Sequence, residues 1–145
     1  MLEQIGEGKF KDLSRQAEMI LDEGESCCVV VKGCWNALYY ASAAGRVMPG
    51  QIIRSDGLRK KDCGTLHITD KRVCFVGRAG AITVQLRKLL RCDVTGDAIH
   101  FIREGRRSAA HFIVESQDAI EVLRAATLKL AEMAKAGVKP RILPA

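Results

Sequence analysis

The chain has 145 residues, of which 48% are hydrophobic and 28% charged, a balance typical of one globular domain with a buried core. No apolar run approaches the roughly 20 residues that a membrane-spanning helix needs, and residues 1–24 lack the apolar block of a signal peptide, so we expect a cytoplasmic protein. The formal net charge of +6 favours an acidic partner, which could be anionic lipid, nucleic acid or an acidic protein surface.

The sequence contains six cysteines: Cys27, Cys28, Cys34, Cys63, Cys74 and Cys92. Their spacing does not resemble that of a small secreted disulfide scaffold, so reduced thiols are the better interpretation. A C-x-x-C pair is absent from the sequence, and neither a zinc ribbon nor a thioredoxin-like redox site is therefore supported.

Apolar residues at helical spacing predict an amphipathic helix over Lys9–Glu23, within an N-terminal unit of residues 1–24. Gly24 stands where such a helix would end. The helix could pack on the domain, on a second copy of the chain or on a membrane surface. Its polar face mixes acids and bases, which favours packing on protein.

The main domain, residues 25–137, is expected to begin with a buried strand at Ser26–Lys32, a short, apolar and β-branched segment. Residues 33–63 then form a long excursion, and a connection of this length in a compact domain carries either a function or structure of its own. Short added strands at Ala37–Ser42 and Gln51–Arg54 are candidates within this excursion.

Residues 64–77, GTLHITDKRVCFVG, predict a β-hairpin with one register. A two-residue turn at Asp70-Lys71 pairs Leu66 with Phe75, so that the apolar side chains of both strands share one face. A slip of one residue would expose the apolar side chains of one strand, and the pattern itself therefore selects the register. Asp tolerates the positive φ that tight hairpin turns often need.

Four further segments alternate apolar and polar residues as strands do: Ala81–Leu86, Leu90–Thr95, Ala98–Arg103 and Ser108–Val114. The second and third of these form a hairpin across Gly96-Asp97, a turn that places Val94 opposite Ile99. An apolar stripe then predicts a helix with Ser116 as its N-cap and Gly137 just beyond its end. Residues 138–145 predict a loose tail.

The hairpin pattern Gly-x-Leu-x-Ile-Thr-Asp-Lys-Arg-Val-x-Phe-x-Gly at residues 64–77 resembles the signature of GRAM-like and bacterial PH-like domains. The resemblance implies a mainly β (α+β) fold, a PH-like barrel of seven antiparallel strands capped by a C-terminal helix. The strands and the helix predicted from alternation agree with that architecture when residues 33–63 are an excursion between the first and second strands.

A basic run with one acid, Asp56, occupies the end of the excursion. Its bases are Arg54, Arg59, Lys60 and Lys61. In PH domains that bind phosphoinositides, bases in the loop between the first two strands hold the phosphates, so the resemblance implies ligand binding by this run. Arg72, at the hairpin, is a further candidate for ligand binding. Arg106 and Arg107 are further candidates. A solvated loop that is basic for solubility is the alternative, because a fold does not determine a function.

Three aromatic residues, Trp35, Tyr39 and Tyr40, lie near this run in the sequence. They are candidates for contact with a membrane headgroup region or with a partner protein. Burial in the core beneath the excursion is the alternative.

Two cross-strand pairs, His67 with Cys74 and Asp93 with His100, could suggest a metal or a nucleophile. A metal needs several converging ligands, and a catalytic cysteine needs a positioned base and an oxyanion site. Alternation along strands accounts for the pairs more simply, and His111 has no evident partner in the sequence. Phosphate-loop, H-E-x-x-H and G-x-S-x-G motifs are absent from the sequence, so we expect no enzyme activity, no metal and no cofactor.

These observations predict a non-catalytic PH-like binding or adaptor module that recognises a protein partner or an anionic phospholipid headgroup, cytoplasmic and peripheral at the inner membrane surface. One alternative is a homo-oligomeric scaffold domain without a small-molecule ligand. Another is a basic nucleic-acid-associated protein. Aromatic residues are sparse and the sequence lacks a helix-turn-helix or RNP-like string, so we expect no nucleic acid partner.

Overall fold

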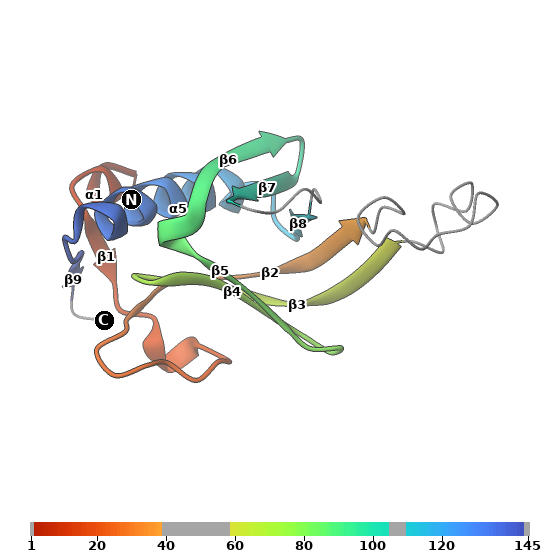
Figure 1. The fold of residues 1–145 in the computed structure, drawn as a ribbon, viewed down its shortest axis with the longest axis horizontal. Coiled ribbons are helices and arrows are strands. Elements are labelled where there is room, and N and C mark those ends of the chain that lie inside the picture. The colour runs from red at the N-terminus through yellow and green to blue at the C-terminus, as the bar shows by residue number, and fades with distance from the viewer. Residues whose placement is uncertain (1, 39–58, 105–109, 144–145) are drawn as a thin grey trace.

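The structure, a computed structural model, describes residues 2–38, 59–104 and 110–143, with the backbone alone at residues 36–38, 59–61 and 110. Figure 1 shows the arrangement of its elements. In chain order these are α1 (Leu2–Gly6), β1 (Lys9–Lys11), the 3-10 turn η1 (Ser14–Gln16), β2 (Cys27–Leu38), β3 (Arg59–Thr69), β4 (Arg72–Gly77), β5 (Ala81–Gln85), the 3-10 turn η2 (Leu86–Lys88), β6 (Leu89–Thr95), β7 (Ala98–Arg103), β8 (Ala110–Val114), α5 (Ala119–Ala136) and β9 (Arg141–Leu143).

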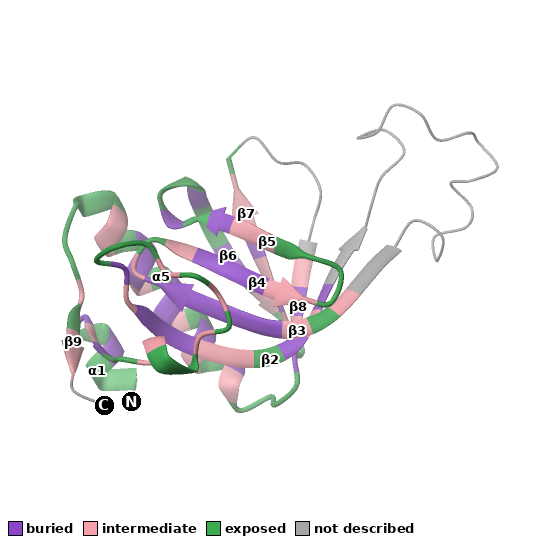
Figure 2. Ribbon diagram, turned by 90° about the horizontal axis from the view of Figure 1, so that it is seen from below, coloured by how far each residue is buried: buried purple, intermediate pink, exposed green. Residues whose placement is uncertain are grey.

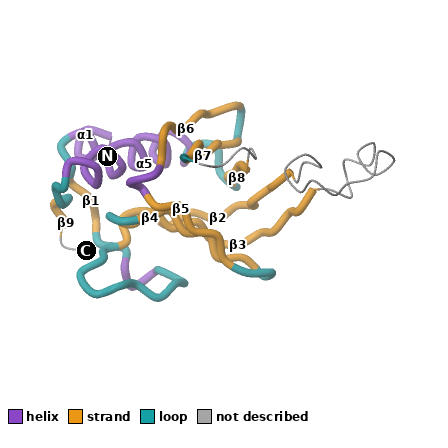
Figure 3. Tube along the Cα trace, viewed as in Figure 1, coloured by secondary structure: helices purple, strands orange, loops and turns teal. Residues whose placement is uncertain are grey.

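Within these ranges, seven strands form one antiparallel sheet in the order β5-β4-β3-β2-β8-β7-β6. Strand β2 joins the two halves, because it pairs with β3 along its length and with β8 over residues Gly33–Ala37. Figures 1 and 3 show the sheet curling over α5, which lies along its inner side. The predicted fold class, a mainly β chain with a curled antiparallel sheet and a closing C-terminal helix, is confirmed.

The hairpin register predicted for residues 64–77 is confirmed, with Leu66 opposite Phe75. The expected positive φ at its turn is wrong, because no residue other than glycine has a positive φ in the described part of the chain. The Thr69 hydroxyl instead accepts hydrogen bonds from the amides of Lys71 (3.1 Å) and Arg72 (3.0 Å). A threonine side chain can close a turn in this way without a left-handed residue.

The core lies between the inner face of the sheet and α5. The largest buried side chains come from both, with Leu66, Phe75 and Phe112 on strands and Leu123 and Leu130 on the helix. Figure 2 shows buried residues along β2, β3 and β4, and α5 contributes further buried residues. Alternation in strands and a three- to four-residue spacing in the helix produce these two apolar surfaces.

Glycines permit neighbouring strands to approach closely where β2 joins the two halves of the sheet. Gly33 lies opposite Gly64, which in turn lies opposite Gly77. A Cβ added at Gly33 would meet a backbone carbonyl oxygen at 2.2 Å, and one added at Gly64 would meet another at 2.1 Å. Only glycine fits at so close an approach of neighbouring backbones.

The amphipathic helix predicted over Lys9–Glu23 is wrong. Residues 9–11 form β1, and in the described stretch between β1 and β2 the chain makes only the 3-10 turn η1. The residues that suggested one helical face have different surroundings, since Phe10 is buried in the core and Ile20 is 91% exposed. The N-terminal helix is the short α1.

The loose tail predicted for residues 138–145 is wrong in part, because Arg141–Leu143 pairs in parallel with β1 as β9. Helix α5 ends before Gly137 as predicted, and this glycine has a left-handed φ of 71°. Its N-cap is Asp118 and not Ser116. These corrections concern chain ends, where pairing with distant segments decides the structure.

The excursion predicted for residues 33–63 is shorter than expected. Strand β2 continues to Leu38 and β3 begins at Arg59. The strand candidate Ala37–Ser42 therefore overlaps β2, whereas Gln51–Arg54 lies outside the described residues. In the described parts of the chain, the helices lack the length and apolar composition that crossing a membrane requires.

We predict that Gly64→Ala lowers the free energy of unfolding by about 2 to 3 kcal/mol, because the new methyl group would overlap the Val76 carbonyl oxygen. Urea denaturation followed by circular dichroism measures this change. Gly6→Ala is the matched control, since a Cβ there has open space, and we expect a change below about 0.5 kcal/mol. Equal effects of the two substitutions would contradict the close approach of β3 and β4.

Candidate functional site

The paired ends of β2 and β3 form an arm at one end of the sheet, which we call the β2–β3 arm (residues 34–38 and 59–63). Pairing of β3 with β4 begins only at Gly64, so Arg59–Cys63 has β2 as its neighbour and extends past the end of β4. Figure 1 shows these two strand ends reaching away from α1 and β9. Of the predicted basic run, Arg59, Lys60 and Lys61 lie at backbone positions of this arm.

A disulfide joins Cys34 and Cys63 across the arm, so the prediction of six reduced thiols is wrong. The two cysteines lie directly opposite each other in the β2–β3 register, which brings their side chains within bonding reach. Their sequence separation is 29 residues, and sequence spacing alone could not show that they face each other. The bridge ties the two strands together at the base of the arm.

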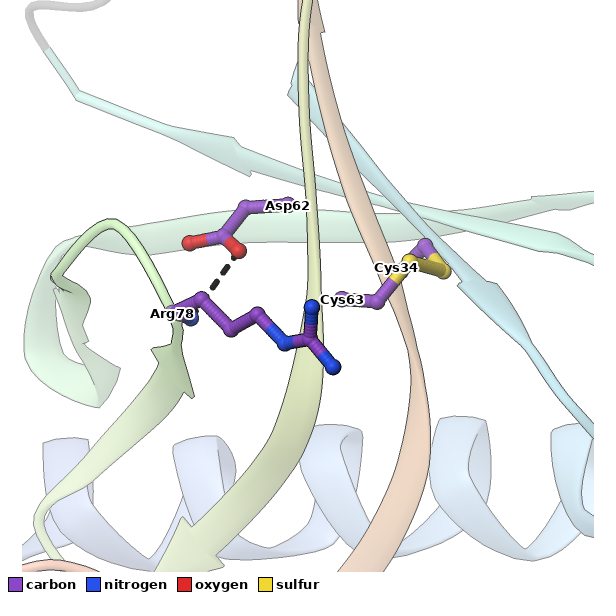
Figure 4. Close-up of a disulfide and its surroundings, with 4 residues drawn as sticks. All are labelled: Cys34, Asp62, Cys63 and Arg78. Carbon is purple, nitrogen blue, oxygen red and sulfur yellow. Dashed lines mark hydrogen bonds between the residues drawn. A yellow bond between two sulfur atoms is a disulfide. The ribbon is translucent and has the colours of Figure 1, made fainter.

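A hollow of about 920 Å³ lies beside the disulfide on the outer face of the sheet. Its charged lining residues are Glu18, Lys32, Asp62, Arg78 and Glu115. Figure 4 shows the Asp62 carboxylate turned toward the Arg78 backbone and Cys63 turned the other way, toward Cys34. The Asp62 carboxylate accepts the amides of Arg78 (3.0 Å) and Ala79 (2.9 Å), and it therefore holds the β4–β5 turn.

Two of these lining residues, Lys32 and Arg78, are cations that the sequence analysis did not select. They lie outside the basic run, with Lys32 within β2 and Arg78 directly after β4, so only the register of β2, β3 and β4 brings them to one place. Because Glu18, Asp62 and Glu115 line the same hollow, its electrostatic potential is not uniformly positive. The hollow as a whole suits a ligand of mixed polarity, whereas the predicted anionic ligand would need the bases of the arm.

The predicted ligand-binding residues are distributed as follows. Arg59, Lys60 and Lys61 lie on β3, opposite Leu38, Ala37 and Asn36 of β2. The positions of Arg59, Lys61 and Cys63 alternate with those of Lys60 and Asp62 between the two faces of the strand. Arg54, Arg106 and Arg107 lie outside the described residues, as do Tyr39 and Tyr40.

Arg72, another predicted ligand residue, makes its contacts with the N-terminal segment. Its guanidinium donates to both carboxylate oxygens of Glu25, each over 3.0 Å, and to the backbone carbonyl of Ile20 over 2.9 Å. The Glu25 carboxylate is fully buried and also accepts the Thr69 hydroxyl at 2.6 Å. Figure 3 shows the segment between β1 and β2 on the side of the sheet opposite α5, where this ion pair holds it.

The ion pair shifts the ionisation of both partners. Burial by itself would raise the pKa of Glu25, but hydrogen bonds from Arg72, Thr69 and the Asp22 amide together lower it below its ordinary value of 4.5. The hydrogen bonds that Arg72 itself donates to Glu25 raise the pKa of Arg72. Both groups therefore stay charged when the protein is folded.

His67 is fully buried, and like Arg72 it holds the N-terminal segment against the sheet. Its Nε2 accepts the amide of Glu18 over 2.9 Å, so its Nδ1 carries the proton and donates to the Cys74 carbonyl oxygen over 3.0 Å. The partner of the histidine is thus the backbone of Cys74 and not its thiol. Asp93 pairs with Arg91, and the rings of His100 and His111 lie 4.8 Å apart.

The described residues offer neither a metal site nor a reactive thiol among Cys27, Cys28 and Cys92. Among the residues that the structure describes, no group of three or more His, Cys, Asp or Glu side chains could hold a metal ion. Burial raises the pKa of the Cys27 thiol to about 11 and the pKa values of Cys28 and Cys92 to about 12. These thiols are protonated at neutral pH and are poor nucleophiles.

Trp35, a predicted membrane or partner contact, belongs to the core. It is 4% exposed, and its ring stacks on Phe101 at a centroid distance of 6.0 Å and lies 5.9 Å from Phe75. This is the burial that the sequence analysis gave as the alternative. Trp35 is therefore not available for contact with a membrane or a partner.

The chain matches no known protein family by sequence and no curated protein. Among solved structures, it is similar to the crystal structure of N-terminally truncated linker-DH/PH domains of p115-RhoGEF, with 10% identity and a TM-score of 0.50. The fold is PH-like. The match covers 90% of this chain and 38% of that one, and at such low identity it extends to the fold alone.

The chain is also similar to a second solved structure. It is the C-terminal domain of an unknown protein from Leishmania infantum, with 16% identity and a TM-score of 0.47, and the match covers 73% of this chain and 87% of that one.

We predict that the unfolded protein shows four reactive thiols without reductant and six after reduction, since all six cysteines lie at described positions and one pair is bridged. Reduction should lower the free energy of unfolding by about 3 kcal/mol, as expected for a covalent loop of this length. Cys34→Ser/Cys63→Ser is the control and should not respond to reductant. Six thiols before reduction would disprove the bridge.

The Glu25–Arg72 pair gives a second stability prediction. Glu25→Ala should lower the free energy of unfolding by about 3 kcal/mol, because it leaves a mostly buried guanidinium without its carboxylate. Asp22→Ala is the matched control. Its exposed carboxylate lies 4.0 Å from Arg72, so a loss below about 1 kcal/mol is expected.

The same pair predicts a pH dependence. Folding lowers the pKa of Glu25, so the ionised carboxylate stabilises the folded protein above pH 4.5, and this stabilisation is lost as the pH falls through the lower folded value. Urea denaturation between about pH 6 and about pH 3 should show a steeper acid loss for the wild type than for Glu25→Gln. Parallel curves would show that Glu25 does not carry the effect.

Proposed function

We propose that this chain is a non-catalytic PH-like binding module of the GRAM-like kind, whose β2–β3 arm docks on an anionic phospholipid surface. The observation that supports this proposal most directly is the position of Arg59, Lys60 and Lys61, three consecutive cations on the strand end that extends beyond β4. The PH-like fold supports a binding module at the coarse level, and the choice of ligand rests on these cations.

The arm has the physical properties that binding to a charged surface needs. Each Lys or Arg close to an anionic membrane contributes about 1 kcal/mol of attraction, so three neighbouring bases give a substantial sum. The Cys34–Cys63 bridge restrains both strands of the arm before binding, and restraint of this kind reduces the entropy lost on association. We propose that the protein acts peripherally at the inner surface of the membrane.

A protein partner is the second candidate, and a different surface favours it. Ile20 is 91% exposed on a segment whose backbone is held by Arg72, so an apolar side chain is presented on a fixed support. The flanking Asp22 and Glu23 are exposed acids, which an anionic membrane would repel. A partner with an apolar pocket and basic rim would fit this segment.

Co-sedimentation with vesicles tests the membrane proposal. Binding of the wild type should increase with the fraction of anionic lipid, and Arg59→Gln/Lys60→Gln/Lys61→Gln should weaken it at least about tenfold. A charge-matched control is Lys11→Gln/Arg15→Gln/Arg91→Gln, which removes three exposed cations elsewhere and should bind like the wild type within about twofold. Equal losses in the two variants would reduce the effect to net charge and refute docking by the arm.

A further inference from the structure

A second hollow lies at the other end of β3, next to the β3–β4 turn. Its volume is about 340 Å³, and we call it the cationic hollow. Three of its lining residues are cations, Lys71, Arg87 and Lys139, and they come from three separate segments of the chain. Because Arg59–Lys61 lie at the opposite end of the same strand, this hollow is distinct from the β2–β3 arm.

Two of these cations are brought together by backbone hydrogen bonds. Lys71 lies in the turn that the Thr69 hydroxyl closes, and its carbonyl oxygen accepts the amide of Leu86 over 3.1 Å. Leu86 is fully buried and begins the 3-10 turn η2, in which Arg87 is the next residue. Burial of Leu86 in the core thus fixes the backbone of the adjacent Arg87 next to the turn that contains Lys71.

The third cation is positioned by the end of α5. Gly137 adopts its left-handed conformation there, and the amides of Gly137 and Val138 donate to the carbonyls of Ala134 (3.3 Å) and Met133 (2.9 Å). These bonds reverse the chain directly before Lys139. They also occupy two of the terminal helix carbonyls, whose partial negative charge would otherwise oppose an anion in the hollow.

The charges of the hollow do not cancel. Among the described residues, the side chains of Lys71, Arg87 and Lys139 form no ion pair and no hydrogen bond, and all three residues are exposed. Asp70 is the one acid in the described lining, and its carboxylate accepts the Ser26 amide over 3.0 Å. A positive excess of two charges therefore surrounds the hollow, and an anion would reduce the repulsion between the cations.

We propose that the cationic hollow binds a phosphate group. Arg87 supplies the planar donor fork that matches two phosphate oxygens, and the two lysines supply ammonium groups. Gln85, which also lines the hollow, adds an amide donor. The volume leaves room for a phosphate with a small substituent, and Val138, 54% exposed at the rim, offers an apolar contact to that substituent.

A phosphate group can come from a soluble phosphomonoester or from a lipid headgroup, and both present the same chemistry to the hollow. The site does not involve the β2–β3 arm, so this proposal can be tested independently of the proposed membrane docking. If the source is a lipid, the protein has cationic sites at both ends of β3 and could bridge two anionic partners.

The first experiment titrates the full chain with glycerol 3-phosphate and follows backbone amides by NMR at constant ionic strength. We expect saturable shifts at the β3–β4 turn, at η2 and at residues 137–139. Lys71→Gln/Arg87→Gln/Lys139→Gln should weaken binding at least about tenfold, which is the loss expected for charge-assisted hydrogen bonds. Lys88→Gln is the matched control, because Lys88 follows Arg87 but does not line the hollow.

Three results would overturn the proposal: shifts that do not saturate, shifts that sodium chloride reproduces, and an equal loss in Lys88→Gln. The arm variant Arg59→Gln/Lys60→Gln/Lys61→Gln should keep the affinity for glycerol 3-phosphate, so failure of the proposed membrane docking would be seen separately. Loss of phosphate binding in the arm variant would also refute the cationic hollow as the site.

The second experiment identifies the source of the phosphate. Vesicles of phosphatidylcholine with phosphatidic acid are compared with vesicles of phosphatidylcholine with a fatty acid at equal charge. A preference of at least about tenfold for phosphatidic acid that is lost in the triple variant of the hollow supports a lipid headgroup. Saturable binding of glycerol 3-phosphate without this preference supports a soluble ligand. The proposal is rejected if the three cations are needed neither for binding of glycerol 3-phosphate nor for binding to vesicles with phosphatidic acid.

Discussion

The close approach of the backbones at Gly33 and Gly64 is the constraint on which the rest of this structure depends. A side chain at either position would meet a carbonyl oxygen of the neighbouring strand, so any larger residue would force the strands apart. This close approach lies where β2 pairs with β3 on one side and with β8 on the other. One strand therefore belongs to both halves of the sheet, and α5 can close the space between them over a single core.

The outer face of the sheet is organised by polar contacts with the N-terminal segment. Glu25 pairs with Arg72, and the Glu18 amide donates to His67, so two residues that could suggest a binding or catalytic role hold the chain in place. Residues occupied in this way are poor candidates for ligand contacts, because a ligand would have to replace buried hydrogen bonds. Within the described residues, two surfaces suited to an anionic ligand remain at the two ends of β3, one with cations that have no such partners and one on a strand end that extends beyond β4.

The two ends of β3 differ in what their structure can bind. The β2–β3 arm carries consecutive bases on one strand end and is covalently restrained by the disulfide, an arrangement suited to an extended anionic surface. The cationic hollow gathers bases from three segments around a volume of about 340 Å³, an arrangement suited to one compact anionic group. The PH-like fold accommodates both without requiring either, since the ligands of a fold are decided by side chains at particular places and not by its topology.

By itself, the sequence determined the hairpin of residues 64–77, the hairpin across Gly96, the end of α5 at Gly137 and the position of the basic run. These features depend on neighbours within a few residues, where alternation, turn chemistry and helical spacing act directly. Only the tertiary structure decided the N-terminal segment, β9, the disulfide and the grouping of cations at the hollow. The Arg72–Glu25 contact spans 47 residues and that of His67 with Glu18 spans 49. The periodicity of the sequence does not reveal such contacts, because they form only when the folded sheet brings distant segments together.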